Sequence, residues 1–143
     1  MQPLKPWMFY LLTFAGCYNL LAALNLTVFY HEVFKTLELP KPELMLFVQL
    51  SGILIGLFGV GYLFVARNPA QNRSLLLLGF LSKAIGSLLS IGYFALGKVP
   101  WTFMVLLFFS DIVYLPPFAV ILRRLYRIAG DPETRQAVEN RRL

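Results

Sequence analysis

Two ionisable side chains lie within long apolar stretches of this 143-residue sequence, and they are the residues best suited to do chemistry. Lys83 interrupts the otherwise uncharged run 74–97, and Asp111 interrupts the run 99–122. A charge at the centre of a bilayer costs about 2.5–3.5 kcal/mol on insertion scales, so each charge should have a partner that offsets this cost.

The two residues are expected at similar depths on neighbouring antiparallel helices. Counted from the inner boundary at a rise of about 1.5 Å per residue, Lys83 is about 12 Å deep and Asp111 about 16 Å deep. The axial gap of about 4 Å is within the reach of a lysine side chain. We therefore predict an intramembrane ion pair.

Other polar groups are expected around this pair. Asn19 is about 18 Å deep by the same count, and its amide could hydrogen-bond to the pair. Pro116 and Pro117 cannot donate to the carbonyl groups four residues before them, so the fourth helix should kink and free acceptors beside the acid. The predicted polar patch consists of Lys83, Asp111, Asn19, Ser110, Tyr114 and the carbonyl groups of Ile112 and Val113.

Two interpretations of this patch remain open at the level of sequence. It is either a structural ion pair that fixes helix register, or a site for a proton, an ion or a small polar headgroup. Intramembrane charges often mark transport pathways, but the patch has neither a second carboxylate nor a histidine relay.

The remaining reactive residue types do not form a catalytic or metal-binding set. Cys17 is the single cysteine and His31 the single histidine, so no internal disulfide and no Cys/His zinc site can form. Burial in an apolar span keeps a thiol inert, so a packing role is expected for Cys17. His31 and Glu32 are adjacent, and adjacent side chains on a helix diverge. We therefore expect no catalytic residue, metal or cofactor.

The composition excludes a disordered chain and an ordinary soluble enzyme. Hydrophobic residues make up 58% and charged residues 14%, with a mean hydropathy of +0.67. Soluble domains have about 45–50% apolar and about 25% charged residues. A net charge of +6 would suggest nucleic acid for a soluble protein. In a membrane protein it indicates cytosolic flanks that contact anionic lipid. The arginines here lack the interleaved aromatic residues on which nucleic-acid bases stack, which argues against RNA binding.

The uncharged runs predict four transmembrane helices within residues 1–122, at about 7–29, 44–66, 75–96 and 101–122. About 20 apolar residues cross a hydrocarbon layer of about 30 Å, and only a helix satisfies its own backbone there. Short connections favour an up-down-up-down bundle. We expect residues 67–73 to form a turn with Pro69 as its breaker. In 31–43, apolar and charged residues interleave, which favours a short interfacial amphipathic turn.

The distribution of Lys and Arg predicts the orientation. With a cytosolic N-terminus, most of them lie on inner segments, which favours both termini inside, as in a bacterial inner membrane. Residues 123–143 would form a basic cytosolic tail facing anionic headgroups. In this tail, Gly130 would end the fourth helix and Pro132 would begin a short cytosolic or interfacial helix reaching Arg142.

Small residues recur at heptad spacing in the second and third spans, which predicts close helix packing. Two of them form a Gly-x-x-x-Gly motif, which allows helix backbones to approach closely. The predicted packing residues are Gly52, Gly56, Gly59, Gly79 and Gly86.

These observations favour a small non-enzymatic membrane protein, either an accessory subunit or a binder of a lipid or lipophilic small molecule within the bundle. The alternative is a small transporter or channel, expected to be a homo-oligomer, that uses Lys83 and Asp111 as a gated charge pair. An intramembrane enzyme acting on lipid ranks third, because no nucleophile and base can be paired.

Overall fold

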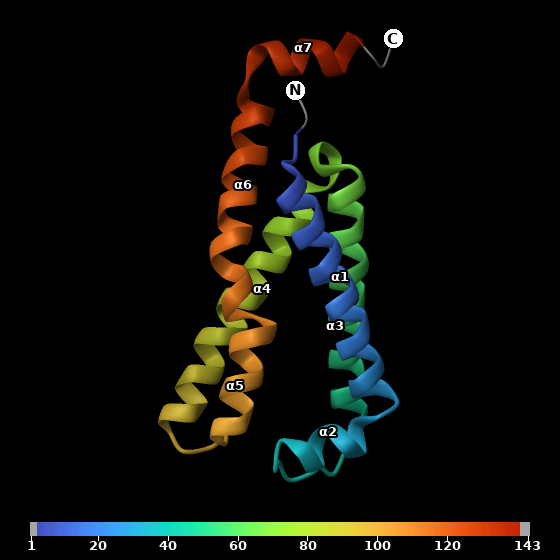
Figure 1. Cartoon of the computed structure of the whole chain (residues 1–143). Helices are drawn as coiled ribbons and strands as arrows, with labels where there is room; N and C mark the ends of the chain where they lie inside the picture. Colours follow the sequence, from blue (N-terminus) through green and yellow to red (C-terminus); the bar gives the residue numbers. More distant parts are fainter. Residues whose placement is uncertain (1–2, 141–143) are drawn as a thin grey trace.

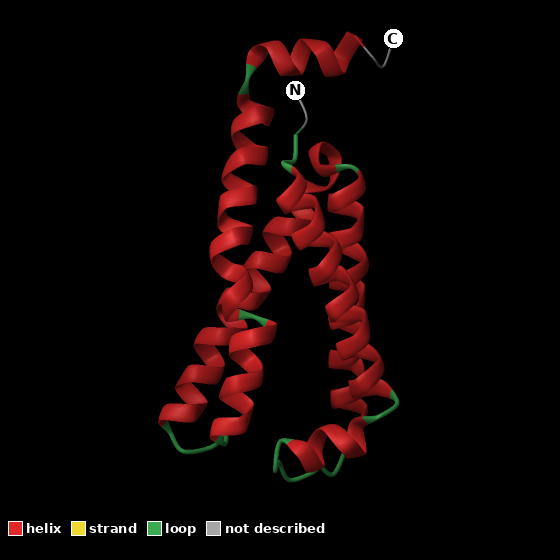
Figure 2. Cartoon of the chain, in the orientation of Figure 1, coloured by secondary structure: helices red, strands yellow, loops and turns green. Residues whose placement is uncertain are grey.

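The computed structural model describes residues 3–140, and the described chain is all-helical with no strand (Figures 1 and 2). This confirms the expected all-α class. The long helices are α1 (Pro6–Thr27), α3 (Leu46–Arg67) and α4 (Pro69–Ala95). The fourth apolar segment, Trp101–Gly130, consists of α5 (Trp101–Ser110), the short 3-10 helix η1 (Ile112–Tyr114) and α6 (Leu115–Gly130). Two further short helices are α2 (Tyr30–Thr36) and α7 (Pro132–Asn140).

Four helical segments of the described chain are long and apolar enough to cross a membrane. They overlap the four predicted spans, with one marked difference at the start of α4. The expected turn 67–73 is wrong, because α4 already begins at Pro69 and only Asn68 separates it from α3. A proline at the first helical position loses no hydrogen bond and has a suitable φ angle, so Pro69 starts a helix here.

The predicted kink in the fourth segment is present, and it begins at Asp111. Pro116 and Pro117 occupy the first turn of α6, and α5 ends at Ser110. Without their N–H groups the α-helical ladder cannot continue through the preceding turn, so residues 112–114 form a 3-10 turn instead.

The basic tail begins as part of α6. This helix ends at Gly130 and Pro132 starts α7, as expected, with Asp131 Oδ1 accepting from the Glu133 backbone N–H at 3.3 Å. Arg124 Nε donates to the Pro3 carbonyl oxygen at 2.9 Å, which ties α6 to the N-terminal segment. The structure describes α7 as far as Asn140, so the expected end at Arg142 lies outside the described residues.

A hydrophobic core occupies the end of the molecule that holds the N-terminal segment. Its members come from α1, α3, α4, η1 and α6, and Leu12, Leu76 and Phe118 are fully buried. At the opposite end the helices diverge into two limbs, one formed by α1, α2 and α3 and the other by α5 and the second half of α4 (Figure 1). Hence the helices do not form a closed bundle along their full length.

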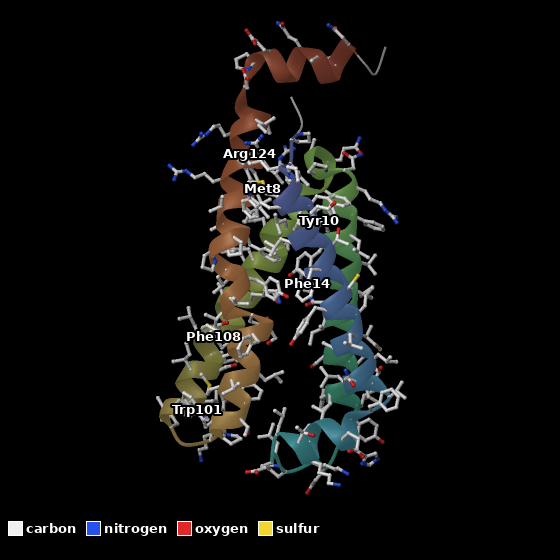
Figure 3. All side chains as sticks on the ribbon, in the orientation of Figure 1. Met8, Tyr10, Phe14, Trp101, Phe108 and Arg124 are labelled. Atoms are coloured by element: carbon white, nitrogen blue, oxygen red, sulfur yellow. The ribbon has the colours of Figure 1, made fainter. Side chains whose placement is uncertain are left out.

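Large apolar side chains cover the outside of the molecule. In Figure 3, Tyr10, Phe14, Trp101 and Phe108 project from the helices, whereas Met8 is buried. So much exposed apolar area is not tolerated in water, whereas lipid tails are as apolar as these side chains. The surface is therefore that of a membrane protein.

Candidate functional site

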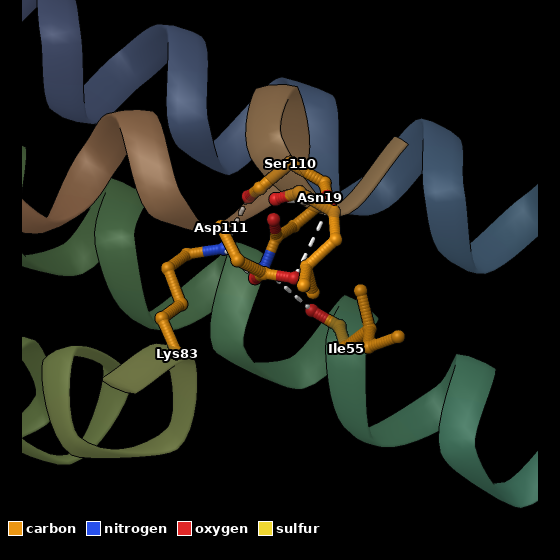
Figure 4. Close-up of polar contacts among 6 residues, drawn as sticks. Asn19, Ile55, Lys83, Ser110 and Asp111 are labelled. Atoms are coloured by element: carbon orange, nitrogen blue, oxygen red, sulfur yellow. Dashed lines mark hydrogen bonds and ion pairs between the residues drawn. The ribbon is translucent and has the colours of Figure 1, made fainter. Parts of the chain in front are cut away.

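Lys83 on α4 and Asp111 at the end of α5 lie next to each other where the two limbs meet (Figure 4). Lys83 Nζ is 2.9 Å from Asp111 Oδ1, and it also donates to the Ser110 backbone carbonyl oxygen at 2.8 Å. The lysine side chain is 6% exposed and the aspartate side chain 29% exposed. The ammonium is thus enclosed by protein, while part of the carboxylate remains accessible.

The break in the fourth segment makes the Ser110 carbonyl available. In a continuous α-helix this oxygen would accept from the backbone N–H of Tyr114. Here that N–H donates to the Asp111 carbonyl oxygen at 3.2 Å, three residues back. Because the intrahelical donor is diverted, the Ser110 oxygen accepts from Lys83. The kink forced by the two prolines therefore supplies part of the lysine's binding pocket.

Two neighbouring side chains complete the surroundings of the pair. The Ser110 hydroxyl donates to Asp111 Oδ2 at 3.1 Å, so both carboxylate oxygens accept a hydrogen bond. Lys83 Nζ lies 5.2 Å from the ring centroid of Tyr114, which is within cation–π distance. Tyr114 is buried and belongs to the hydrophobic core, so the pair sits at the boundary of that core.

The predicted patch is brought together in part. Ser110 and Tyr114 contact the pair, whereas Asn19 donates its Nδ2 to the Ile55 carbonyl oxygen at 3.2 Å (Figure 4). Asn19 therefore joins α1 to α3, and no hydrogen bond links it to the pair among the described residues. The Ile112 carbonyl oxygen accepts from the Leu115 N–H and does not reach Lys83.

A cavity of about 710 Å³ lies between the two limbs and ends at the pair. Pockets for small molecules span about 300–1,000 Å³, so this volume suits a ligand of drug-like size. Most of the lining is aliphatic or aromatic, and it is contributed by α1, α2, α3, α4, α5 and the α2–α3 connection. Its apolar members include Leu21, Ala22, Leu26, Val33, Phe34, Val48, Ile55, Phe58, Phe103, Leu106 and Leu107.

Polar groups also line this cavity, and besides Asn25, Ser51 and Ser82 they gather at its two ends. The inner end has Tyr18, Asn19, Lys83, Ser110 and Asp111, and α2 contributes Glu32 and Thr36 at the other end. The Thr102 hydroxyl of α5 donates to the Leu37 carbonyl oxygen at 3.0 Å. This hydrogen bond joins the two limbs at the end remote from the core.

Apart from Asn19 and Ser110 of the predicted patch, the cavity-lining residues beyond the pair were not predicted from sequence. Periodicity shows which face of a helix is apolar, but lipid-facing and cavity-facing apolar side chains look alike in a sequence. No sequence signal distinguishes Phe58 or Phe103 from the many exposed phenylalanines.

Four of the five predicted packing glycines lie in tight contacts. A Cβ added at Gly59 would be 2.8 Å from the Gly16 carbonyl oxygen, and one at Gly52 would be 2.9 Å from Leu26 Cβ. At Gly56 the neighbour is Ala23 Cβ, at 2.9 Å, and at Gly79 it is the Tyr62 ring. These contacts draw α1 to α3 and α3 to α4.

The prediction for Gly86 is wrong within this chain, because a Cβ there would meet nothing within 4 Å. The heptad count assumes that α4 packs against its neighbours along its whole length. After Lys83, however, the second half of α4 diverges from the limb formed by α1, α2 and α3.

The other candidate reactive residues lie apart from the pair. Cys17 is exposed on α1, which contradicts the expected packing role. The packing face of α1 is formed instead by its buried residues, which include Leu12, Ala15, Gly16 and Asn19. His31 Nδ1 contacts Lys41 Nζ on the exposed surface near α2. No group of three or more His, Cys, Asp or Glu side chains in the described part of the chain could hold a metal ion.

No protein-family model, no curated protein and no solved structure matches this chain.

Proposed function

We propose that this chain is a small, non-enzymatic membrane protein that binds a lipophilic molecule between its two limbs. One observation carries the proposal: an apolar cavity of about 710 Å³ that ends at a buried ion pair. Concave sites with apolar walls and a few convergent polar groups are the usual form of a ligand site. The walls would take the apolar body of the ligand, and the polar end would orient it.

In this proposal the four apolar segments cross the membrane with both ends of the chain on the cytosolic side, in a bacterial inner membrane. The N-terminal segment and α7 lie at one end of the molecule, which supports a common side for them (Figure 1). That end also bears Arg67, Arg73 and the arginines of α6, so the positive-inside bias favours the cytosol. Anionic headgroups would then contact these side chains.

Native mass spectrometry of gently extracted protein tests the binding proposal. We expect an adduct of defined mass on the wild type, which Ala22→Phe removes by filling the cavity wall on α1. Leu57→Phe, on the exposed face of α3, is the matched control and should keep the adduct. A wild-type protein without any adduct, or an adduct unaffected by Ala22→Phe, would contradict the proposal. The same spectra report a homo-oligomer or a bound partner subunit.

Transport is the second candidate, and one observation favours it. The cavity ends at the pair, and beyond the pair the hydrophobic core closes the molecule. A site reached from one side and sealed on the other is expected of one state of a transporter. Flux of protons or ions in proteoliposomes, lost in a folded Lys83→Met/Asp111→Asn variant, would favour this candidate over simple binding.

A further inference from the structure

We propose that the molecule bound in the cavity is a lipophilic amine, whose protonated head is held by Asp111. This inference rests on the proposed function and deepens it by naming the chemical class of the ligand. It follows from the hydrogen-bonding capacity and the aromatic rings at the inner end of the cavity, and from the net charge of the whole lining.

The inner end offers a carboxylate and an amide oxygen as acceptors; the neutral hydroxyls of Tyr18 and Tyr62 also line it, and its one ammonium, Lys83, is already engaged. Lys83 gives one N–H to Asp111 Oδ1 and one to the Ser110 carbonyl oxygen, and only 6% of its side chain is exposed. An ionised carboxylate has about four lone-pair sites, and Asp111 uses one for Lys83 and one for the Ser110 hydroxyl. Its 29% exposure places the remaining acceptor capacity within reach of a ligand.

Asn19 adds a second acceptor on the same lining. Its Nδ2 is taken by the Ile55 carbonyl oxygen, and no group in the described chain donates to its Oδ1. A primary ammonium has three N–H donors, so it satisfies a carboxylate and an amide oxygen together. A ligand carboxylate or phosphate would instead be repelled by Asp111, and the ammonium that could offset this repulsion is already bound to Asp111 and Ser110.

The charge and the rings of the lining favour a cation as well. The ionisable acids and bases on the lining are Glu32, Lys83 and Asp111: Lys83 and Asp111 balance each other at the inner end, and Glu32 adds a negative charge at the other end. Tyr18, Phe58 and Tyr62 contribute aromatic rings near the inner end, and ring faces attract ammonium groups.

Three probes with one tail and different heads test the inference: octylamine, octanol and octanoate. Binding to wild-type protein in a nonionic detergent at pH 7 is followed by the rise in thermal midpoint with probe concentration. We expect octylamine to bind about tenfold more tightly than octanol, because a charge-assisted hydrogen bond is about twice as strong as a neutral one. Octanoate should bind weakest.

Substitutions at the pair test the assignment of the head to Asp111. Asp111→Asn leaves the Lys83 ammonium without its carboxylate, so the preference should invert towards octanoate. Lys83→Gln/Asp111→Asn carries no charge and should lose the preference between amine and carboxylate, which keeps the test available if the single variant does not fold. Glu43→Gln, an exposed acid outside the cavity lining, is the matched control and should keep the wild-type order.

The outcomes separate the two proposals. If no probe binds the wild type, the cavity is not a lipophilic site and the proposed function fails. If octanol or octanoate binds as tightly as octylamine, or if Asp111→Asn keeps the amine preference, the amine assignment is overturned while lipophilic binding stands. Octylamine binding that survives Ala22→Phe would place the probe outside the cavity and also overturn the assignment.

Discussion

The ammonium of Lys83 and the backbone carbonyl oxygen of Ser110 are 2.8 Å apart, and this contact exists because the fourth apolar segment breaks at Asp111. The break exposes a backbone acceptor for the lysine, and beyond it Phe118, Ile121 and Leu125 of α6 pack in the core. The ion pair, the kink and the inner end of the cavity therefore form one structural unit.

The pair should show strong energetic coupling. Lys83→Met leaves a partly buried carboxylate without its cation and should lower the free energy of unfolding by about 3 kcal/mol, since removing one partner of a buried pair costs about 3–5 kcal/mol. Asp111→Asn should act in the same direction, and the double variant Lys83→Met/Asp111→Asn should recover most of the loss. Chemical unfolding of the four proteins in detergent measures the cycle. Additive losses would show that the pair contributes no specific interaction.

Restoring the missing backbone donors should straighten the fourth segment. Pro116→Ala/Pro117→Ala supplies N–H groups for the Ile112 and Val113 carbonyls and removes the ring clash that disfavours helix there. Spin labels at Val105 and Val120, both exposed, should then report a longer distance by pulsed electron spin resonance. Pro100→Ala, before α5, is the control and should leave the distance unchanged. A wild-type distance in the double variant would mean that the prolines do not cause the break.

Two glycines that both lie in the interior of a long helix should differ sharply in their tolerance of alanine. Gly59→Ala places a Cβ 2.8 Å from the Gly16 carbonyl oxygen, so α1 and α3 must separate, at a cost of about 1–3 kcal/mol. Gly86→Ala meets open space and should stabilise the protein by about 0.4–1 kcal/mol through the lower entropy of its unfolded chain. The thermal midpoints of the two variants, compared with that of the wild type, test both expectations. A destabilising Gly86→Ala would reveal a contact made in an assembly of several chains.

The hydrogen bond between Thr102 and the Leu37 carbonyl oxygen should restrain α2 against α5. Thr102→Val removes the donor while keeping the side-chain shape, and hydrogen exchange in residues 30–37 should become faster. Thr13→Val is the matched control, because the Thr13 hydroxyl bonds to the Phe9 carbonyl oxygen within α1. Equal exchange in wild type and Thr102→Val would show that this bond does not hold the limbs together.

Much of the helical architecture could be predicted from sequence, because hydrophobic length and proline chemistry are local properties. The apolar runs locate the four segments, and Pro116 with Pro117 predicts the break. The start of α4 was misplaced because Pro69 is as suitable for a first helical turn as for a loop. Whether such a proline begins a helix or lies in a loop depends on whether the residues after it continue as a helix.

The candidate site was less predictable, because it depends on how helices diverge. Depth counting placed Asn19 near the pair, but the tight α1–α3 packing directs its amide to Ile55. Gly86 fits the heptad stripe, but α4 leaves the other limb before that point. The cavity itself arises from this divergence, which no single helix encodes.

Photolabelling with an alkylamine that carries a diazirine in its tail tests directly whether the cavity between the limbs binds a lipophilic amine. Peptides within 18–26, 48–62 and 103–111 should be labelled, and excess octylamine or the Ala22→Phe substitution should abolish this labelling. Labelling confined to outward-facing residues such as Leu81 and Leu88, insensitive to octylamine and to Ala22→Phe, would contradict this expectation.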